Sequence, residues 1–180
     1  MLKTALPTLM RINIIATGGT IEKVYSERSG KVENIDGKIS RYLSLLRLPD
    51  SDVHVLPLMN KDSLEMTSSD RLLIFATVRA LSQENAPVIV THGTDTMVQT
   101  GLYLHAQLPD IAIPVILTGA MIPLGFDGSD GLQNLTESLF AARVLQPGIY
   151  VVMHGQAFPI YAVRKDHELG RFVSTDEHVM

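Results

Sequence analysis

Five short runs rich in isoleucine and valine are the feature that most limits how this chain can fold. Apolar residues fill nearly every position of each run, as in strands that are buried on both faces of a sheet. The runs are residues 11–16, 52–58, 87–92, 113–117 and 148–153. Apolar residues between the runs recur every three or four positions, which predicts helices within residues 39–48, 68–84, 97–108 and 132–142. This alternation predicts one α/β domain over residues 1–180, a doubly wound, mostly parallel sheet flanked by helices.

Composition narrows the class of protein. The 180 residues carry a formal net charge of −4 and no dense run of lysine or arginine, which argues against nucleic acid or an anionic membrane as a partner. No stretch approaches the roughly 18 consecutive apolar residues that span a membrane. The chain has no cysteine, which excludes disulfides, thiolate zinc sites and a cysteine nucleophile. We expect a cytoplasmic protein.

The first apolar run ends in a glycine pair between two threonines, Thr17-Gly18-Gly19-Thr20. The glycines would let the backbone turn tightly and approach a ligand closely. Thr20 would then present its hydroxyl at the edge of the sheet, where ligands of parallel sheets bind, and a base would make it a nucleophile. Tyr25 is the nearest titratable candidate for that base. On these residues alone, a plain turn after the strand is the alternative interpretation.

The third apolar run ends in His92-Gly93-Thr94-Asp95-Thr96. Residues 94–96 open a predicted helix, whose first backbone amides favour an anion. Asp95 either stabilises that first turn or binds a substrate ammonium group. No second histidine lies at metal-ligand spacing from His92, so we expect a hydrogen-bonded core histidine.

Two polar segments complete the motifs. Residues 23–38 are rich in Ser, Glu, Gly, Asn and Asp, which predicts a mobile loop where a lid would lie. The run Asp127-Gly128-Ser129-Asp130-Gly131 has the spacing of a calcium loop without its full set of ligands, so we predict a turn before the helix.

Ser68 or Ser69, just before Asp70, is expected to cap the second helix. We expect no metal site, and the loops match neither nucleotide-binding glycine pattern.

Taken together, three motifs resemble those of a known family. Thr-Gly-Gly-Thr-Ile at residues 17–21, His-Gly-Thr-Asp-Thr-Met at 92–97 and Thr-Gly-Ala-Met-Ile-Pro at 118–123 occur in that order, followed by Asp130-Gly131 and Asn134. The set resembles the bacterial-type L-asparaginase family, which includes glutaminase-asparaginases and related amidohydrolases. The resemblance extends over nearly the whole chain. It implies the fold of the N-terminal asparaginase domain and hydrolysis of L-asparagine to L-aspartate and ammonia, with no cofactor.

The resemblance also implies the site residues. Thr20 matches the threonine nucleophile, Lys165 the lysine of the site, and Ser63 the serine that holds the substrate α-carboxylate. The implied catalytic residues are Thr20, Tyr25, Thr94, Asp95 and Lys165, and the implied substrate-binding residues are Gly19, Ser63, Thr94, Asp95 and Ala120, the last through its backbone carbonyl. Without the resemblance, Lys165 would be interpreted as a surface lysine in the charged segment 164–166.

This set suits amide hydrolysis, which needs a nucleophile, stabilisation of an oxyanion and a proton for the departing ammonia. Thr94, Lys165 and Asp95 would form a chain of hydroxyl, amine and carboxylate. Asp95 would also pair with the substrate ammonium, which would select amino acid amides over simple amides. The residues leave open whether Thr20 forms an acyl-enzyme or the two threonines orient a water, and we favour attack by Thr20.

The chain also departs from the family pattern. Leu64 stands after Ser63 where many relatives carry a polar substrate ligand, which leaves Asp95, Glu65 or a partner chain to bind the ammonium. Longer members carry a second domain that helps to complete a neighbouring subunit's site, so a chain ending at Met180 implies a short form or a fragment. We therefore expect a homodimer or homotetramer that acts on a small-molecule substrate. Alternative functions are a glutaminase or an ammonia-supplying subunit, or a non-catalytic amino-acid binder, against which the two threonines and the lysine argue.

Overall fold

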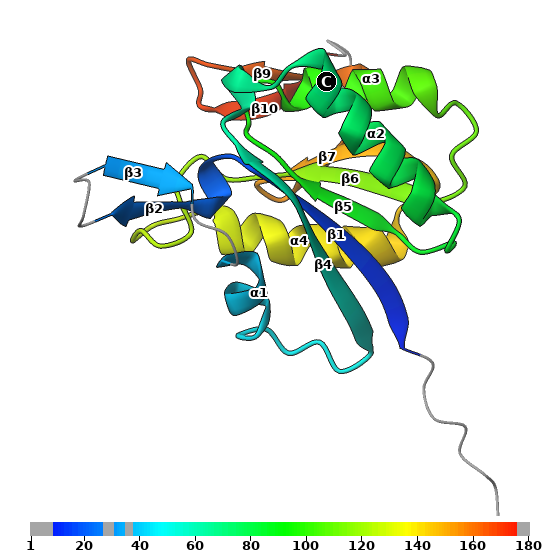
Figure 1. Ribbon diagram of the computed structural model, residues 1–180, viewed down its shortest axis with the longest axis horizontal. Helices are drawn as coiled ribbons and strands as arrows, with labels where there is room; N and C mark the ends of the chain where they lie inside the picture. The colour runs from blue at the N-terminus through cyan, green and yellow to red at the C-terminus, as the bar shows by residue number, and fades with distance from the viewer. Residues whose placement is uncertain (1–8, 27–30, 35–37, 176–180) are drawn as a thin grey trace, which may run out of the picture.

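Parallel strands form the centre of the molecule, and helices cover both faces of the sheet (Figure 1). The structure is a computed structural model that describes residues 9–26, 31–34 and 38–175. The sheet has the strand order β4-β1-β5-β6-β7-β8; β8 runs antiparallel to β7, and the other pairs are parallel. Its strands are β1 (Met10–Gly18), β4 (Ser51–Lys61), β5 (Val88–Thr91), β6 (Pro114–Thr118), β7 (Gly148–Met153) and β8 (Gln156–Pro159). The predicted fold class is confirmed.

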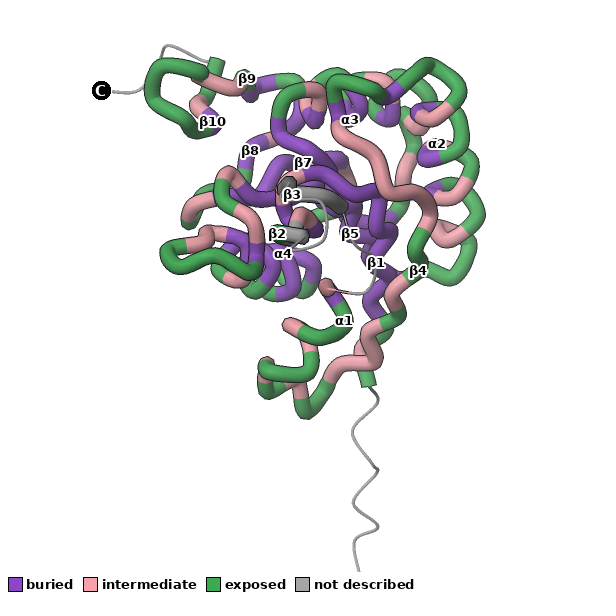
Figure 2. Tube along the Cα trace, turned by 60° about the vertical axis from the view of Figure 1, so that its left-hand side comes forward, coloured by how far each residue is buried: buried purple, intermediate pink, exposed green. Residues whose placement is uncertain are grey.

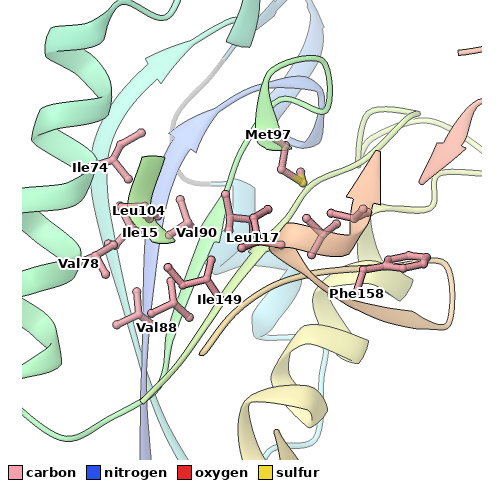
Figure 3. Close-up of a cluster of buried hydrophobic side chains, with 14 of the residues drawn as sticks. Ile15, Ile74, Val78, Val88, Val90, Met97, Leu104, Leu117, Ile149 and Phe158 are labelled. Atoms are coloured by element: carbon pink, nitrogen blue, oxygen red, sulfur yellow. The ribbon is translucent and has the colours of Figure 1, made fainter. Parts of the chain in front are cut away.

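The unbroken apolar runs supply two cores because successive strand residues point to opposite faces of a sheet. The helices are α1 (Lys38–Leu43), α2 (Ser68–Ser82), α3 (Met97–Gln107) and α4 (Gly131–Val144). Ile15 and Val90 pack with α2 and α3 on one face (Figure 3), whereas Ile14 and Ile89 pack with α1 and α4 on the other. Full burial of an isoleucine or leucine side chain contributes about 1.5–3 kcal/mol to stability. The strands β1, β5 and β7 are accordingly buried, and the side of α2 that faces away from the sheet is exposed (Figure 2).

Two antiparallel hairpins lie outside the central sheet. β2 (Lys23–Ser26) pairs with β3 (Lys31–Asn34), so the prediction of a loop is wrong for these residues. The β-branched and aromatic residues Val24, Tyr25 and Val32 favour extended backbone, which outweighs the polar composition of the segment. Residues 27–30 and 35–37 of the predicted loop lie outside the described residues. The second hairpin pairs β9 (Val163–Asp166) with β10 (Arg171–Ser174) and carries Lys165.

Two helix ends differ from their predictions. The first helix ends at Leu43 rather than near residue 48, and the next residue, Ser44, turns its hydroxyl back to the Arg41 carbonyl at 2.6 Å. Thr67, not Ser68 or Ser69, caps α2, because its hydroxyl accepts from the Asp70 N–H while the Asp70 carboxylate accepts from the Thr67 N–H. This reciprocal arrangement requires an acid three residues after the cap, and only Thr67 has that spacing from Asp70.

None of the helices among the described residues is both long enough and apolar enough to cross a membrane.

Candidate active site

The carboxyl ends of β1 and β5 lie side by side at the point where the chain reverses its direction across the sheet (Figure 1). From β1 the chain proceeds to β4 on one side, and from β4 it crosses through α2 to β5 on the other. Loops leave such a switch point in opposite directions, and ligands of open α/β sheets bind between them. Thr20 follows β1 and Thr94 follows β5, so both predicted threonines lie at the switch point.

Glycines allow three loops to meet there. Gly19 has φ 81° and ψ −175°, a conformation that is essentially restricted to glycine, and a Cβ on it would lie 2.4 Å from the Gly93 backbone nitrogen. A Cβ on Gly93 would in turn lie 2.6 Å from Ser63 Oγ. These close approaches place the turns that carry Thr20, Ser63 and Thr94 directly against one another.

The amine of Lys165 joins the second threonine loop to the β9–β10 hairpin. Its Nζ donates to Thr94 Oγ1 at 2.8 Å and to Asp95 Oδ1 at 2.6 Å. Thr94 is buried, whereas 13% of the Lys165 side chain and 38% of the Asp95 side chain remain exposed. The structure thus brings the predicted hydroxyl, amine and carboxylate into one connected chain whose acid reaches solvent.

His92 is buried behind this loop. Its Nδ1 lies 2.7 Å from the Gly93 carbonyl oxygen and its Nε2 lies 2.9 Å from Thr100 Oγ1, so Nδ1–H donates to Gly93 and Nε2 accepts from Thr100. Burial lowers the pKa of His92 to about 4; the hydrogen bond to Gly93 opposes this effect, and the nearby positive charge of Arg71 adds to it. The prediction of a hydrogen-bonded core histidine is confirmed.

Ser63 offers a buried hydroxyl beside Gly93. The residue is 1% exposed, and its Oγ has no hydrogen-bond partner among the described residues. Thr96 Oγ1 donates to the Ser63 carbonyl at 2.8 Å, which fixes the turn against the start of α3. A buried hydroxyl without a partner is costly, so this position is suited to a polar ligand group.

Ala120 lies in the loop after β6, on the side of the first threonine loop. It is buried in a small cluster with Ile21, the residue after Thr20, and Leu124. Asn134 on α4 is also buried, and its Nδ2 donates to the Gly119 carbonyl at 3.0 Å. The structure therefore packs Ala120 in the same cluster as the residue that follows Thr20.

Asp130 fixes the same loop from the start of α4. Its carboxylate accepts from the N–H groups of Met121 at 3.0 Å and Ile122 at 2.9 Å, and it lies 2.7 Å from His154 Nε2. Burial raises the pKa of Asp130, but these hydrogen bonds outweigh burial and hold it below its ordinary value. The calcium-like spacing is therefore a turn before α4, as predicted. No group of three or more His, Asp or Glu side chains within residues 9–26, 31–34 and 38–175 is arranged to hold a metal ion.

Thr20 and Tyr25 are less constrained than Thr94. Thr20 is partly exposed, and its hydroxyl makes no hydrogen bond with any described residue. Tyr25 is 55% exposed on β2, and in the described part of the chain no hydrogen bond connects it with Thr20 or Lys165. The contact between Gly19 and Gly93 therefore places the Thr20 turn against the Thr94 loop, and Tyr25 makes no hydrogen bond to either threonine in the described part of the chain.

Sequence reasoning missed two contributions around the site. One is His154, which pairs with Asp130; its position just after the run 148–153 was a usable signal, because strand ends point to this edge of the sheet. The other is the ion pair between Lys23 and Asp62 at 2.7 Å, which ties the β2–β3 hairpin to the Ser63 turn. The hydrogen bond from Lys23 lowers the pKa of Asp62, and no sequence pattern links two residues so far apart.

Comparison with known proteins identifies relatives of this chain. L-asparaginase of Thermococcus kodakarensis is 31% identical over 161 residues, which cover 89% of this chain and 49% of that protein. The solved structure of the thermostable L-asparaginase from the same organism superposes with a TM-score of 0.81 at 30% identity, over 92% of this chain and 51% of that one. A glutamyl-tRNA(Gln) amidotransferase subunit of Methanococcus vannielii is 28% identical over 156 residues, 83% of this chain and 35% of that protein.

The chain spans about half the length of the first of these relatives, and less of the amidotransferase subunit. The family described as "Asparaginase, N-terminal" matches residues 11–174, which is nearly all of the chain that the structure describes. Sequence motifs, sheet order and family match agree, and this chain belongs to the asparaginase N-terminal domain family.

Proposed function

We propose that this site hydrolyses the side-chain amide of L-asparagine to L-aspartate and ammonia, with Thr20 as the nucleophile. One observation carries the proposal: Lys165 Nζ lies within 2.8 Å of Thr94 Oγ1 and 2.6 Å of Asp95 Oδ1. A lysine that bridges a buried hydroxyl and a carboxylate forms a route for protons, which amide hydrolysis requires and simple binding does not.

The proposed reaction has two steps: ammonia is displaced first, and water then hydrolyses the ester. Thr20 Oγ attacks the amide carbon and forms an ester as the carbon–nitrogen bond breaks, and the departing nitrogen takes a proton and leaves as ammonia. Water then attacks the ester carbon, which releases L-aspartate and restores the Thr20 hydroxyl. Thr94, Lys165 and Asp95 supply and accept the protons of the two steps. The unbonded Thr20 hydroxyl supports this assignment, because no described residue competes for it.

In this proposal, residues around the Thr20 hydroxyl bind the substrate. The buried Ser63 hydroxyl would donate to the α-carboxylate, and Asp95, the most exposed of the bonded trio, would pair with the α-ammonium. Gly19 would let the backbone approach the substrate, and the Ala120 carbonyl would accept from the side-chain amide. Leu64 is 72% exposed beside Ser63, so it offers the ammonium no polar partner.

The activity of the whole protein is also a proposal, because the chain spans only part of its relatives. We propose a homodimer or homotetramer in the cytoplasm, with a neighbouring chain supplying contacts to the substrate ammonium. Tyr25, which is 55% exposed on the β2–β3 hairpin, would complete the site by taking or relaying the Thr20 proton. Sedimentation of an active monomer would exclude the oligomer.

A second candidate is hydrolysis of glutamine to supply ammonia to a partner protein. The specific observation in its favour is the similarity to an amidotransferase subunit, at 28% identity over 156 residues. Both candidates use the same residues, so the substrate separates them. Preferential release of ammonia from glutamine would favour the second candidate over the first.

The deciding experiment measures ammonia release by the full chain from L-asparagine, L-glutamine and D-asparagine. We expect L-asparagine to be the preferred substrate and Thr20→Ala to lower its turnover by at least about 1000-fold. Thr136→Ala, on the exposed side of α4, is the matched control and should retain the parent activity. Near-native turnover by Thr20→Ala would exclude Thr20 as the nucleophile, and binding of asparagine without ammonia release would identify a non-catalytic binder.

A further inference from the structure

A cleft separate from the candidate active site lies between the first turn of α2 and the first half of α3. Its volume is about 400 Å³, and it is lined by Ser68, Ser69, Arg71, Leu72, Gln99 and Tyr103. None of these residues belongs to the proposed hydrolase site. We propose that this cleft is a second ligand site, which binds a small molecule through a carboxylate or phosphate group.

The first argument is the charge of Arg71. This residue is 8% exposed, and no carboxylate of the described residues lies within ion-pair distance of its guanidinium. Its Nη1 donates to the Met66 carbonyl and its Nη2 to Gln99 Oε1, both at 3.0 Å, while Nε has no hydrogen-bond partner among the described residues. These bonds use two of the five N–H donors of an arginine. A buried cation with spare donors and no counter-charge is costly to the fold unless an anion pairs with it.

The second argument is that the polar wall of the cleft consists of donors. Ser68 and Ser69 are the first two residues of a fifteen-residue helix, so their backbone N–H groups have no partner within that helix. Ser68 and Ser69 are exposed residues with hydroxyl groups. Gln99 Oε1 accepts from Arg71, so the amide N–H groups of Gln99 are left to donate. Oriented amides, hydroxyls and a guanidinium around one cleft are the groups that recognise an oxyanion.

Asp70, the acid next to Arg71 in the sequence, does not take the place of that anion. Asp70 directs its carboxylate to Lys61 Nζ at 2.8 Å and to the N–H and hydroxyl of Thr67. The hydrogen bond from Lys61 lowers the pKa of Asp70 to about 2, and Asp70 is not among the residues that line the cleft. Leu72 and the Tyr103 ring, which packs edge-on against Phe75 at 6.3 Å, give the cleft an apolar wall for a short carbon chain.

The cleft is tied to the candidate active site through one residue. The Met66 carbonyl accepts from Arg71, and the Met66 N–H donates to the Ser63 carbonyl at 3.3 Å. A ligand that pairs with Arg71 therefore acts on the end of the turn that presents the Ser63 hydroxyl. The binding proposal itself does not depend on the hydrolase activity, because it uses none of the same side chains.

The test is a titration of the ¹⁵N-labelled full chain with inorganic phosphate and, separately, with succinate, at constant ionic strength. The signals to follow are the backbone N–H groups of Ser68 and Ser69 and the side-chain Nε–H of Arg71. We expect saturable shifts of these signals, with a dissociation constant of about 1 mM or tighter for the better anion. The anion that saturates at the lower concentration identifies the ligand group as phosphate or carboxylate.

Two variants on α2 make the result specific. Arg71→Gln should weaken binding at least about tenfold, whereas Arg79→Gln, which removes the same charge from the exposed side of the helix, should leave it within about twofold. If Arg71→Gln does not fold, the Ser68→Ala/Ser69→Ala double variant removes two exposed hydroxyls and should weaken binding about threefold. The proposal fails if neither anion gives saturable shifts at these residues, or if Arg79→Gln weakens binding as much as a cleft variant does.

Discussion

The two threonine loops meet at the same edge of the sheet but are held there in opposite ways. Thr94 is buried, and its hydroxyl accepts a hydrogen bond from Lys165 at 2.8 Å. Thr20 is partly exposed, its hydroxyl is unbonded within the described residues, and its turn is positioned by the contact between Gly19 and Gly93. One loop is fixed by its side chains and the other by its backbone.

In the proposed hydrolysis, this difference suits the two hydroxyls to different roles. A hydroxyl that already accepts a hydrogen bond from an amine is placed to exchange protons, and its geometry is fixed before substrate arrives. A hydroxyl without a partner is free to attack a substrate, and its loop can move without breaking a hydrogen bond of that side chain. In the proposed hydrolysis, the Thr94 hydroxyl would be held in place for proton transfer, and the Thr20 hydroxyl would be free to attack the substrate.

The largest expected effect comes from removing the Lys165 amine, which holds the Thr94 loop through two hydrogen bonds. Lys165→Met keeps a long apolar side chain on β9 but ends both hydrogen bonds to Thr94 and Asp95. We expect ammonia release from L-asparagine to fall about 10⁴-fold, with little change in the free energy of unfolding, because the contribution is to proton transfer. Steady-state kinetics and urea unfolding measure the two quantities.

Arg164→Met is the matched control for this prediction. Arg164 is the exposed neighbour of Lys165 on the same strand, and it contacts Asp166 rather than the threonine loop. Its activity should stay within about twofold of the parent chain. Equal losses in the two variants would mean that the hairpin, and not the Lys165 amine, supports activity.

The central sheet could be predicted from the sequence because each of its buried strands is marked by a local pattern of residues. Each buried strand is a run of apolar residues, and the two cores follow from the alternation along runs such as residues 11–16. The strands β2, β3, β8, β9 and β10 were missed because they are short and carry mixed polar residues. Their pairing depends on neighbours in space, which no periodicity records.

The candidate site was predictable only in part for the same reason. The threonine motifs stand at strand ends, and that rule places Thr20 and Thr94 at one edge. Lys165 lies 71 positions from Thr94, in a charged segment that on its own predicts a surface lysine. Only the family resemblance suggested it. The burial of Ser63 and Arg71 arises from tertiary packing and had no local signal.

A change at Gly19 tests whether backbone contact positions the first loop. In Gly19→Ala the new Cβ would lie 2.4 Å from the Gly93 nitrogen, and the residue would occupy backbone angles that suit only glycine. We expect the free energy of unfolding to fall by about 4 kcal/mol, from steric overlap added to backbone strain. Urea denaturation of the variant and the parent chain measures the difference.

Gly128→Ala measures the cost of an L residue at a positive φ where no steric overlap is added. Gly128 has a similar φ of 76°, but a Cβ there would meet nothing within 4 Å. Backbone strain alone should cost about 1 kcal/mol. If Gly19→Ala were no more destabilising than Gly128→Ala, the contact between the loops would be loose and backbone packing would not position Thr20.

The smallest of the three expected effects concerns His92, which supports the Thr94 loop through its hydrogen bond to Gly93. The folded pKa of His92 is about 4 against 6.5 for a free histidine, so between these values the unfolded chain binds a proton that the folded chain does not. Its contribution to stability is complete above pH 6.5, falls as the pH drops toward 4, and amounts to about 3 kcal/mol. Urea unfolding at pH 7, 5 and 4 should show this loss in the parent chain.

Comparing His92→Gln with His167→Gln identifies the source of that loss. His92→Gln cannot titrate and should lose less stability on acidification, whereas the exposed His167→Gln should follow the parent chain. Equal pH dependence in all three would show that other groups cause the loss. Protonation at Nε2 need not break the bond from Nδ1 to Gly93, since the Thr100 hydroxyl can rotate and accept. The destabilisation is then the cost of burying a charge, so the Thr94 loop should keep its geometry until the whole chain unfolds.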